Sequence, residues 1–217
     1  MKLMFSAVCV RYSEIVKAQV KLTLRANLII SAAVLLLTHI IFGIDNLDST
    51  ASAFILEHFA SLTGIIMITP VFLPEQDKNI SELAESKYTP MTGIYLTRII
   101  LAAVSLFLLL SGFTAVMILM SCEFDILKFI FGTFITAFFL GASGFITYSV
   151  SNNIVVGYLL PLGYYTFNMF IGSKQLKYIY LFTLTQNGFT EKYSLLGLGL
   201  IFIAAGILFR YILSKTR

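Results

Sequence analysis

Six long apolar stretches constrain the fold of this chain more than any other feature. They cover residues 26–44, 54–73, 94–120, 129–150, 153–172 and 194–213. Each has or approaches the roughly 20 residues that an α-helix needs to cross about 30 Å of hydrocarbon. Only 12% of the 217 residues are charged, about half the share that is usual in soluble domains. The sequence therefore predicts an all-α integral membrane protein with six transmembrane helices.

The distribution of lysine and arginine predicts the orientation of these spans. Most of the 15 basic residues lie in the first 25 residues, between residues 78 and 98, or after residue 209. Cytoplasmic loops are enriched in lysine and arginine, so both termini and the connection between the second and third spans are expected in the cytoplasm. Four lysines would lie on the opposite side: Lys128, Lys174, Lys177 and Lys192.

Residues 1–25 carry too many charges to form a span. On a helical wheel the charged side chains from Arg11 to Arg25 gather within an arc of about 120°, and apolar side chains such as Val8, Ile15 and Val20 cover the other side. This pattern predicts an amphipathic helix that lies in the cytoplasmic membrane interface. Its role would be that of a passive anchor or of an element that transmits motion to the transmembrane domain, residues 26–217.

A polar connection, residues 74–93, joins the second and third spans. Asn79 can cap a helix, with Glu82 three positions later as in a capping box. Apolar residues such as Ile80 and Leu83 recur at helical spacing, and Pro90 ends the pattern. We expect a short amphipathic helix that binds a soluble partner; the alternative is a solvated connector with helical character.

A second connection precedes the last span. Residues 176–189 are largely apolar but too short to cross a bilayer comfortably, and a seventh span would place the basic C-terminus outside. The sequence predicts an outer-face or re-entrant helix there, which requires protein or a water-filled cavity around its backbone.

Three ionisable residues lie near the expected outer ends of the first two spans: His39, Glu57 and His58. Ionisable groups inside a bilayer are costly and usually face a cavity or one another. An outer gate or a hydrogen-bonded polar cluster is the first interpretation. Contact with lipid headgroups and metal or catalytic chemistry are the others.

The fifth expected span carries three further polar candidates. Tyr164, Tyr165 and Asn168 could line a path for an amphipathic substrate. Polar residues at helix interfaces also commonly bridge neighbouring helices, and both interpretations stand at this point.

Several catalytic signatures are missing from the sequence. It contains no Gly-x-x-x-x-Gly-Lys-Ser/Thr loop for phosphate, no His-Glu-x-x-His and no Gly-x-Ser-x-Gly. We therefore expect no ATP hydrolysis by that route, and we assign no catalytic and no metal-ligating residue.

A set of residues in the cytoplasmic connection and in the two spans after the third forms a further pattern. These residues are Glu75, Ser81-Glu82-Leu83, Thr89-Pro90, Tyr95-Leu96-Thr97-Arg98, 139–144, Asn152-Asn153 and 157–162. They include a Pro-Glu exit from the second span, a short acidic and apolar helix, and a proline that opens the third span. The pattern resembles that of type-2 ABC transporter permeases. Six spans with both ends inside, and a short outer helical segment before the last span, are also similar to that family's layout.

This resemblance implies one half of an exporter for a hydrophobic or amphipathic substrate, such as a peptide, an antibiotic or a lipid. A second permease subunit, identical or different, would complete the path in a bacterial inner or plasma membrane, surrounded by membrane lipid. A separate ABC ATP-binding subunit would bind ATP and Mg, so this chain itself would bind no cofactor and no nucleic acid. The residues implied to fit the ATPase groove are Glu75, Glu82, Leu83 and Glu85.

Two other classes of function fit the sequence. One is a membrane immunity or sensor protein that transports nothing and whose cytoplasmic connection binds a soluble regulator. The other is an intramembrane enzyme centred on His39, Glu57 and His58.

Overall fold

The computed structural model describes residues 24–76, 91–172, 176, 178–186 and 188–216. All regular secondary structure in these residues is helical, and six helical stretches are long and apolar enough to cross a membrane. The predicted all-α class is therefore confirmed, and each of the six predicted spans corresponds to one of these helical stretches in the described residues. Most of the predicted interfacial helix and most of the cytoplasmic connection, residues 77–90, lie outside the described residues.

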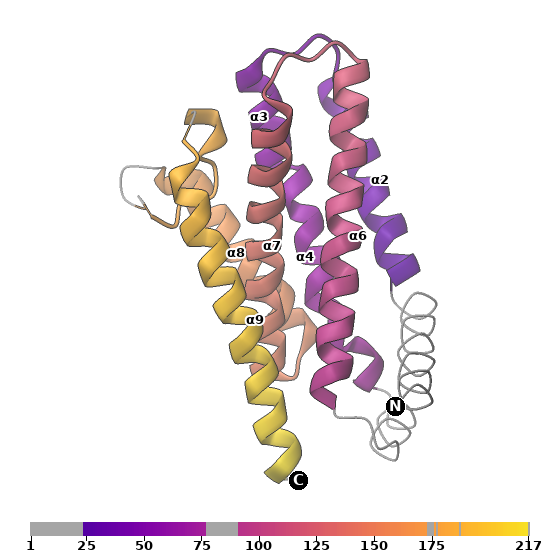
Figure 1. Ribbon diagram of the computed structural model, residues 1–217, viewed down its shortest axis with the longest axis vertical. Coiled ribbons are helices and arrows are strands. Elements are labelled where there is room, and N and C mark those ends of the chain that lie inside the picture. Colours follow the sequence, from indigo (N-terminus) through magenta and orange to yellow (C-terminus); the bar gives the residue numbers. More distant parts are fainter. Residues whose placement is uncertain (1–23, 77–90, 173–175, 177, 187, 217) are drawn as a thin grey trace, which may run out of the picture.

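The helices form an antiparallel bundle (Figure 1). We call the end that carries the C-terminus the terminal end, and the end that carries residues 43–48, 120–125 and 178–186 the loop end. The described elements are α2 (Arg25–Phe42), α3 (Ser49–His58), η2 (Ala60–Leu62), α4 (Thr63–Ile68), η3 (Thr69–Gln76), α6 (Met91–Leu119), α7 (Ile126–Ser151), α8 (Ile154–Ile171), η4 (Leu184–Gln186) and α9 (Thr190–Thr216).

The second span is a broken helix made of α3, η2, α4 and η3. It begins at Ser49, before the predicted residue 54, because the side chain of Asp48 accepts a hydrogen bond of 2.9 Å from Ala51 N and caps α3. Near its other end Pro70 adopts non-helical backbone angles, φ −83° and ψ 21°. Proline has no N–H group to donate within the helix, so the regular hydrogen bonding is interrupted there. The sequence predicted this span but not its breaks.

α7 lies at the centre of the bundle and packs against α4, α8 and α9. Glycines allow the backbones to approach closely at these contacts. A Cβ atom on Gly64 would lie 1.9 Å from the carbonyl oxygen of Ala137, and one on Gly206 would lie 2.6 Å from the ring of Phe145. By contrast, α2 and α6 lie at the side of this core (Figure 1), and many of their apolar side chains face outward.

Candidate functional site

A buried ion pair lies near the loop end of the bundle. Glu57 is in the last turn of α3, Lys192 is in the first turn of α9, and the distance from Nζ to Oε1 is 2.6 Å. Both side chains are 0% exposed. The ammonium group of Lys192 also donates hydrogen bonds of 2.6 Å each to the Thr136 hydroxyl on α7 and to the Leu181 carbonyl oxygen. The lysine thus joins α3, α7 and α9 to the connection that precedes α9.

The carboxylate of Glu57 has backbone partners as well. Leu184 N lies 3.0 and 3.1 Å from its two oxygens, and Thr185 N lies 3.3 Å from Oε2. Buried charges are costly unless they are paired and hydrogen-bonded. Here both conditions are met, and the partners come from residues far apart in the sequence.

The same connection is bound by polar side chains of α8. Asn168 accepts a hydrogen bond of 3.1 Å from Leu181 N, and its amide group donates to Tyr164 O at 2.9 Å. Tyr164 donates its hydroxyl hydrogen to Ile179 O. These contacts bridge α8 to its own preceding turn and to the connection, as polar residues at helix interfaces commonly do.

The side chain of His58, next to Glu57 in the chain, belongs to an aromatic stack. The ring of His58 lies 3.8 Å from that of Phe182 and 4.3 Å from that of Phe54, measured between ring centroids. Tyr165 on α8 donates its hydroxyl hydrogen to His58 O at 2.7 Å. His58 and Phe182 therefore fix the connection against the end of α3.

We call residues 178–186 the plug segment, because residues 181–184 are buried between the helices. Its only regular element is the single 3₁₀ turn η4, so the helical segment predicted over residues 176–189 is corrected: the described residues of that range form a mostly irregular connection. The physical reason is that side chains take the backbone groups a helix would use. Glu57 and Asn168 accept from three of its N–H groups, and Lys192 donates to one of its carbonyl oxygens.

Tyr180, in the plug segment, is affected by the same cluster. Burial raises the pKa of its phenol, and the negative charge of Glu57 raises that pKa further. The phenol therefore keeps its proton at neutral pH.

The structure separates the three ionisable residues that the sequence grouped near the outer end. Glu57 and His58 both contact the plug segment, whereas His39 lines a different pocket, between α2 and α6. No hydrogen bond in the described part of the chain joins His39 to either of the others. Of the four residues implied to bind an ATPase, Glu82, Leu83 and Glu85 lie outside the described residues. So does the side chain of Glu75.

Lys192 is the residue that sequence reasoning missed. Its charge suggested a place in an outer loop, and the last span was predicted to begin at residue 194. In the structure α9 begins at Thr190 and Lys192 is enclosed by the bundle. One signal was available in the sequence. Lys192 is a single lysine at the outer edge of an apolar run, and Glu57 was expected near the same outer side of the membrane on another span. Intramembrane acids and bases commonly pair.

The described residues contain no group of three or more His, Cys, Asp or Glu side chains that could hold a metal ion. No protein-family model, curated protein or solved structure matches this chain. Membership of the ABC permeases is therefore a prediction from the sequence resemblance alone.

Replacing Asn168 with leucine should loosen the plug segment. The substitution leaves the buried Leu181 N–H without its acceptor, which costs about 1–3 kcal/mol. Hydrogen–deuterium exchange should therefore be faster at residues 179–184 than in the unmodified protein. The matched control is Thr166→Leu, at an exposed position of the same helix. Equal protection in the two variants would mean that Asn168 does not hold the segment.

Proposed function

We propose that this chain is the permease subunit of an ATP-driven ABC exporter. It forms half of a translocation path for a hydrophobic or amphipathic substrate and is coupled to a separate ATPase subunit. The observation that carries the proposal is the Glu57–Lys192 pair, which holds the plug segment in the end of the bundle.

The ion pair supports a transport role because its net contribution to the stability of the fold is expected to be small. Removing two charges from water costs several kcal/mol per ion, and the mutual attraction often does no more than offset this. Ionisable residues inside transmembrane segments commonly belong to substrate pathways or to moving parts. Glu57 and Lys192 come from different helices, and both also bind the backbone of the plug segment. In this proposal the loop end faces outward, and the pair keeps the path closed there until substrate leaves.

Contacts at the terminal end support a coupling role for the adjoining cytoplasmic connection. The guanidinium of Arg210 on α9 lies 4.7 Å from the ring centroid of Phe72 and donates a 2.9 Å hydrogen bond to the Asn152 side chain. Arg98 on α6 donates to Val71 O at 3.2 Å. η3, which leads directly into the connection, is thus tied to α6, α7 and α9. A displacement of the connection would move η3 against all three helices.

The remaining parts of the proposal follow the family resemblance. Glu75, Glu82, Leu83 and Glu85 bind the groove of the ATPase, which itself holds ATP and Mg. Residues 1–25 lie on the cytoplasmic face of a bacterial inner membrane, both termini are cytoplasmic, and a second permease subunit completes the path. ATP hydrolysis can drive transport only through a contact that differs between nucleotide states. In this proposal that contact is the short helix predicted in the cytoplasmic connection.

We propose no enzymatic role for the residues near the loop end. Each carboxylate oxygen of Glu57 is engaged by Lys192 or by backbone N–H groups. His58 is buried, and its Nδ1 is hydrogen-bonded to Phe54 O at 3.2 Å. A general base needs access to the proton that it removes, and neither group offers it in this arrangement.

The proposal is tested by co-purification and by one substitution. A tagged chain extracted in mild detergent should retain an ATPase subunit that carries a phosphate-binding loop. Leu83→Asp should abolish both this association and substrate-stimulated ATP hydrolysis, because it places a charge on the predicted apolar face of the connecting helix. The control is Ser86→Asp, which adds the same charge on a different face. If no ATPase is retained and added ATPase is not stimulated, the sensor or immunity alternative is favoured instead.

A further inference from the structure

One face of α9 carries a cation near each end of the bundle. The helix runs without a break from Thr190 to Thr216, about 40 Å at 1.5 Å per residue. Lys192 and Arg210 are separated by 18 positions in the sequence. This is five turns at 3.6 residues per turn, so the two side chains leave the helix on the same side, about 27 Å apart.

The two cations hold different parts of the chain. At the loop end Lys192 binds Glu57 and a carbonyl oxygen of the plug segment. At the terminal end the guanidinium of Arg210 lies 4.7 Å from the ring centroid of Phe72 on η3 and donates a 2.9 Å hydrogen bond to the side chain of Asn152, in the turn after α7. Contacts of a cation with an aromatic face or with a hydrogen-bond acceptor are among the stronger polar contacts in proteins.

Between the two cations this face carries no charge. Its buried residues there are Leu195, Gly199, Ile203 and Gly206. A Cβ atom on Gly199 would lie 3.1 Å from the ring of Phe138, and one on Gly206 would lie 2.6 Å from the ring of Phe145. The Ser149 hydroxyl donates to Gly206 O at 2.8 Å, one turn before Arg210. The middle of α9 thus packs on α7 through rings and glycines, and the contacts of its side chains with other elements are concentrated at the two ends.

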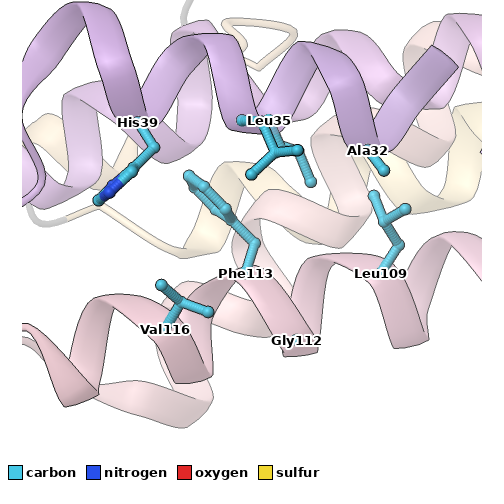
Figure 2. Close-up of a pocket in the computed structure, with 8 residues that line it drawn as sticks. Ala32, Leu35, His39, Leu109, Gly112, Phe113 and Val116 are labelled. Carbon is cyan, nitrogen blue, oxygen red and sulfur yellow. The ribbon is translucent and has the colours of Figure 1, made fainter. Parts of the chain in front are cut away.

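The other long helices are less suited to connect the two ends. α7 is the centre of the bundle and packs closely on three neighbours. The second span is interrupted at η2 and at Pro70, so its two halves need not move together. α2 and α6 face each other at the side across a largely apolar pocket, where Leu35 points toward Phe113 (Figure 2). By contrast, α9 is continuous, and outer side chains such as Leu200 and Leu208 are exposed, which leaves it room to tilt.

We propose that α9 couples the two ends of the bundle by tilting as one rigid helix. When η3 moves away from Arg210, the terminal end of α9 is released, and Lys192 withdraws from Glu57 and from the plug segment. Rigid helices transmit such displacements along their length. A shift of about 1 Å at Lys192 Nζ lengthens its hydrogen bonds of 2.6 Å beyond good geometry. The coupling is a property of this chain, whereas its direction, from the cytoplasmic connection to the plug segment, rests on the proposed function.

The test removes the contact at one end and measures the other end. Arg210→Met keeps a long side chain without the guanidinium. Hydrogen–deuterium exchange of the purified full chain in detergent should become about fivefold faster at residues 179–184, the lower end of the usual coupling between two sites. Arg25→Met is the matched control, because it removes an exposed cation from the same end of the bundle, at the start of α2. Arg210→Lys keeps a cation near Phe72 and should retain most of the protection.

Coupling between two sites is reciprocal, so the same effect should be seen in the other direction. The Glu57→Gln, Lys192→Met double variant removes the ion pair without leaving an unpaired charge. Exchange at residues 71–73 and 152–155 should then rise by a similar factor. The control is Asn168→Leu, which loosens the plug segment from α8 without removing a contact of α9, and which should leave those terminal-end residues protected.

Three results would overturn the proposal. Unchanged exchange of the plug segment in the Arg210→Met variant would show that the ends are independent. An equal rise at residues 135–145 of α7 would show a general loss of stability. Faster exchange at the terminal end in the Asn168→Leu variant would show that α9 is not the connecting element. None of these measurements includes an ATPase, so their outcome is separate from that of the co-purification that tests the proposed function.

Discussion

Replacing Lys192 with methionine should lower the free energy of unfolding by about 3–5 kcal/mol, the usual cost of removing one partner of a buried ion pair. Methionine has a similar length, so the main loss is electrostatic. Glu57 would keep its hydrogen bonds from Leu184 N and Thr185 N but no cation within the enclosed cluster. Helical circular dichroism followed during heating in detergent measures the effect. In the transport proposal the same variant should also leak substrate in the absence of ATP.

A double substitution separates the charge effect from a packing effect. Glu57→Gln combined with Lys192→Met removes both charges, so most of the lost stability should return. The control is Lys128→Met, at the start of α7 and outside the cluster, which should unfold within about 0.5 kcal/mol of the unmodified protein. If the double variant is less stable than the Lys192→Met variant, the charges are not the reason for the loss.

Replacing Gly64 with alanine should destabilise the protein by about 3 kcal/mol, the upper part of the usual range for overpacking. The new Cβ would lie 1.9 Å from the carbonyl oxygen of Ala137 and 2.7 Å from its Cα. These are backbone atoms of α7, so no side-chain rotation can relieve the contact. The α4 segment must move away from the central helix, and the unfolding temperature should fall accordingly.

A matched glycine controls for the general effect of alanine in a helix. Gly197 lies on α9, and a Cβ there would meet no atom within 4 Å. Alanine is the better helix former by about 1 kcal/mol, so Gly197→Ala should leave stability unchanged or raise it. Similar unfolding temperatures for the Gly64→Ala and Gly197→Ala variants would contradict the close approach of α4 and α7.

The membrane-length helices could be predicted from hydropathy, because a helix that crosses hydrocarbon must be apolar along most of its length. Each helix needs a long apolar run, and the polar pair Asn152-Asn153 marks a turn that the structure places between α7 and α8. Asn152 adopts left-handed backbone angles, φ 51°, which asparagine tolerates better than most residues. The side chain of Asn153 then caps α8. Such local chemistry can be identified from a sequence.

The plug segment and the partner of Glu57 could not be predicted in the same way. A run such as residues 176–189 is apolar whether it forms a helix or an irregular chain held by side chains from elsewhere. The partners that decide between the two, Glu57 and Asn168, belong to other spans. Hydropathy likewise predicts that Lys192, as a charged residue, lies in a loop outside the membrane. Only the packing of α3, α7 and α9 shows that its ammonium group is fully paired.

The pairing of Glu57 with Lys192 also has a consequence for biosynthesis. The two residues are separated by 135 positions in the chain, and Lys192 belongs to the last span. A growing chain therefore inserts its acidic second span well before the ribosome has made the lysine that neutralises it. A chain that stops before Thr190 leaves Glu57 without this partner and loses the contacts of α9 with α7. Incomplete chains should for this reason be less stable and open to degradation by membrane quality-control proteases.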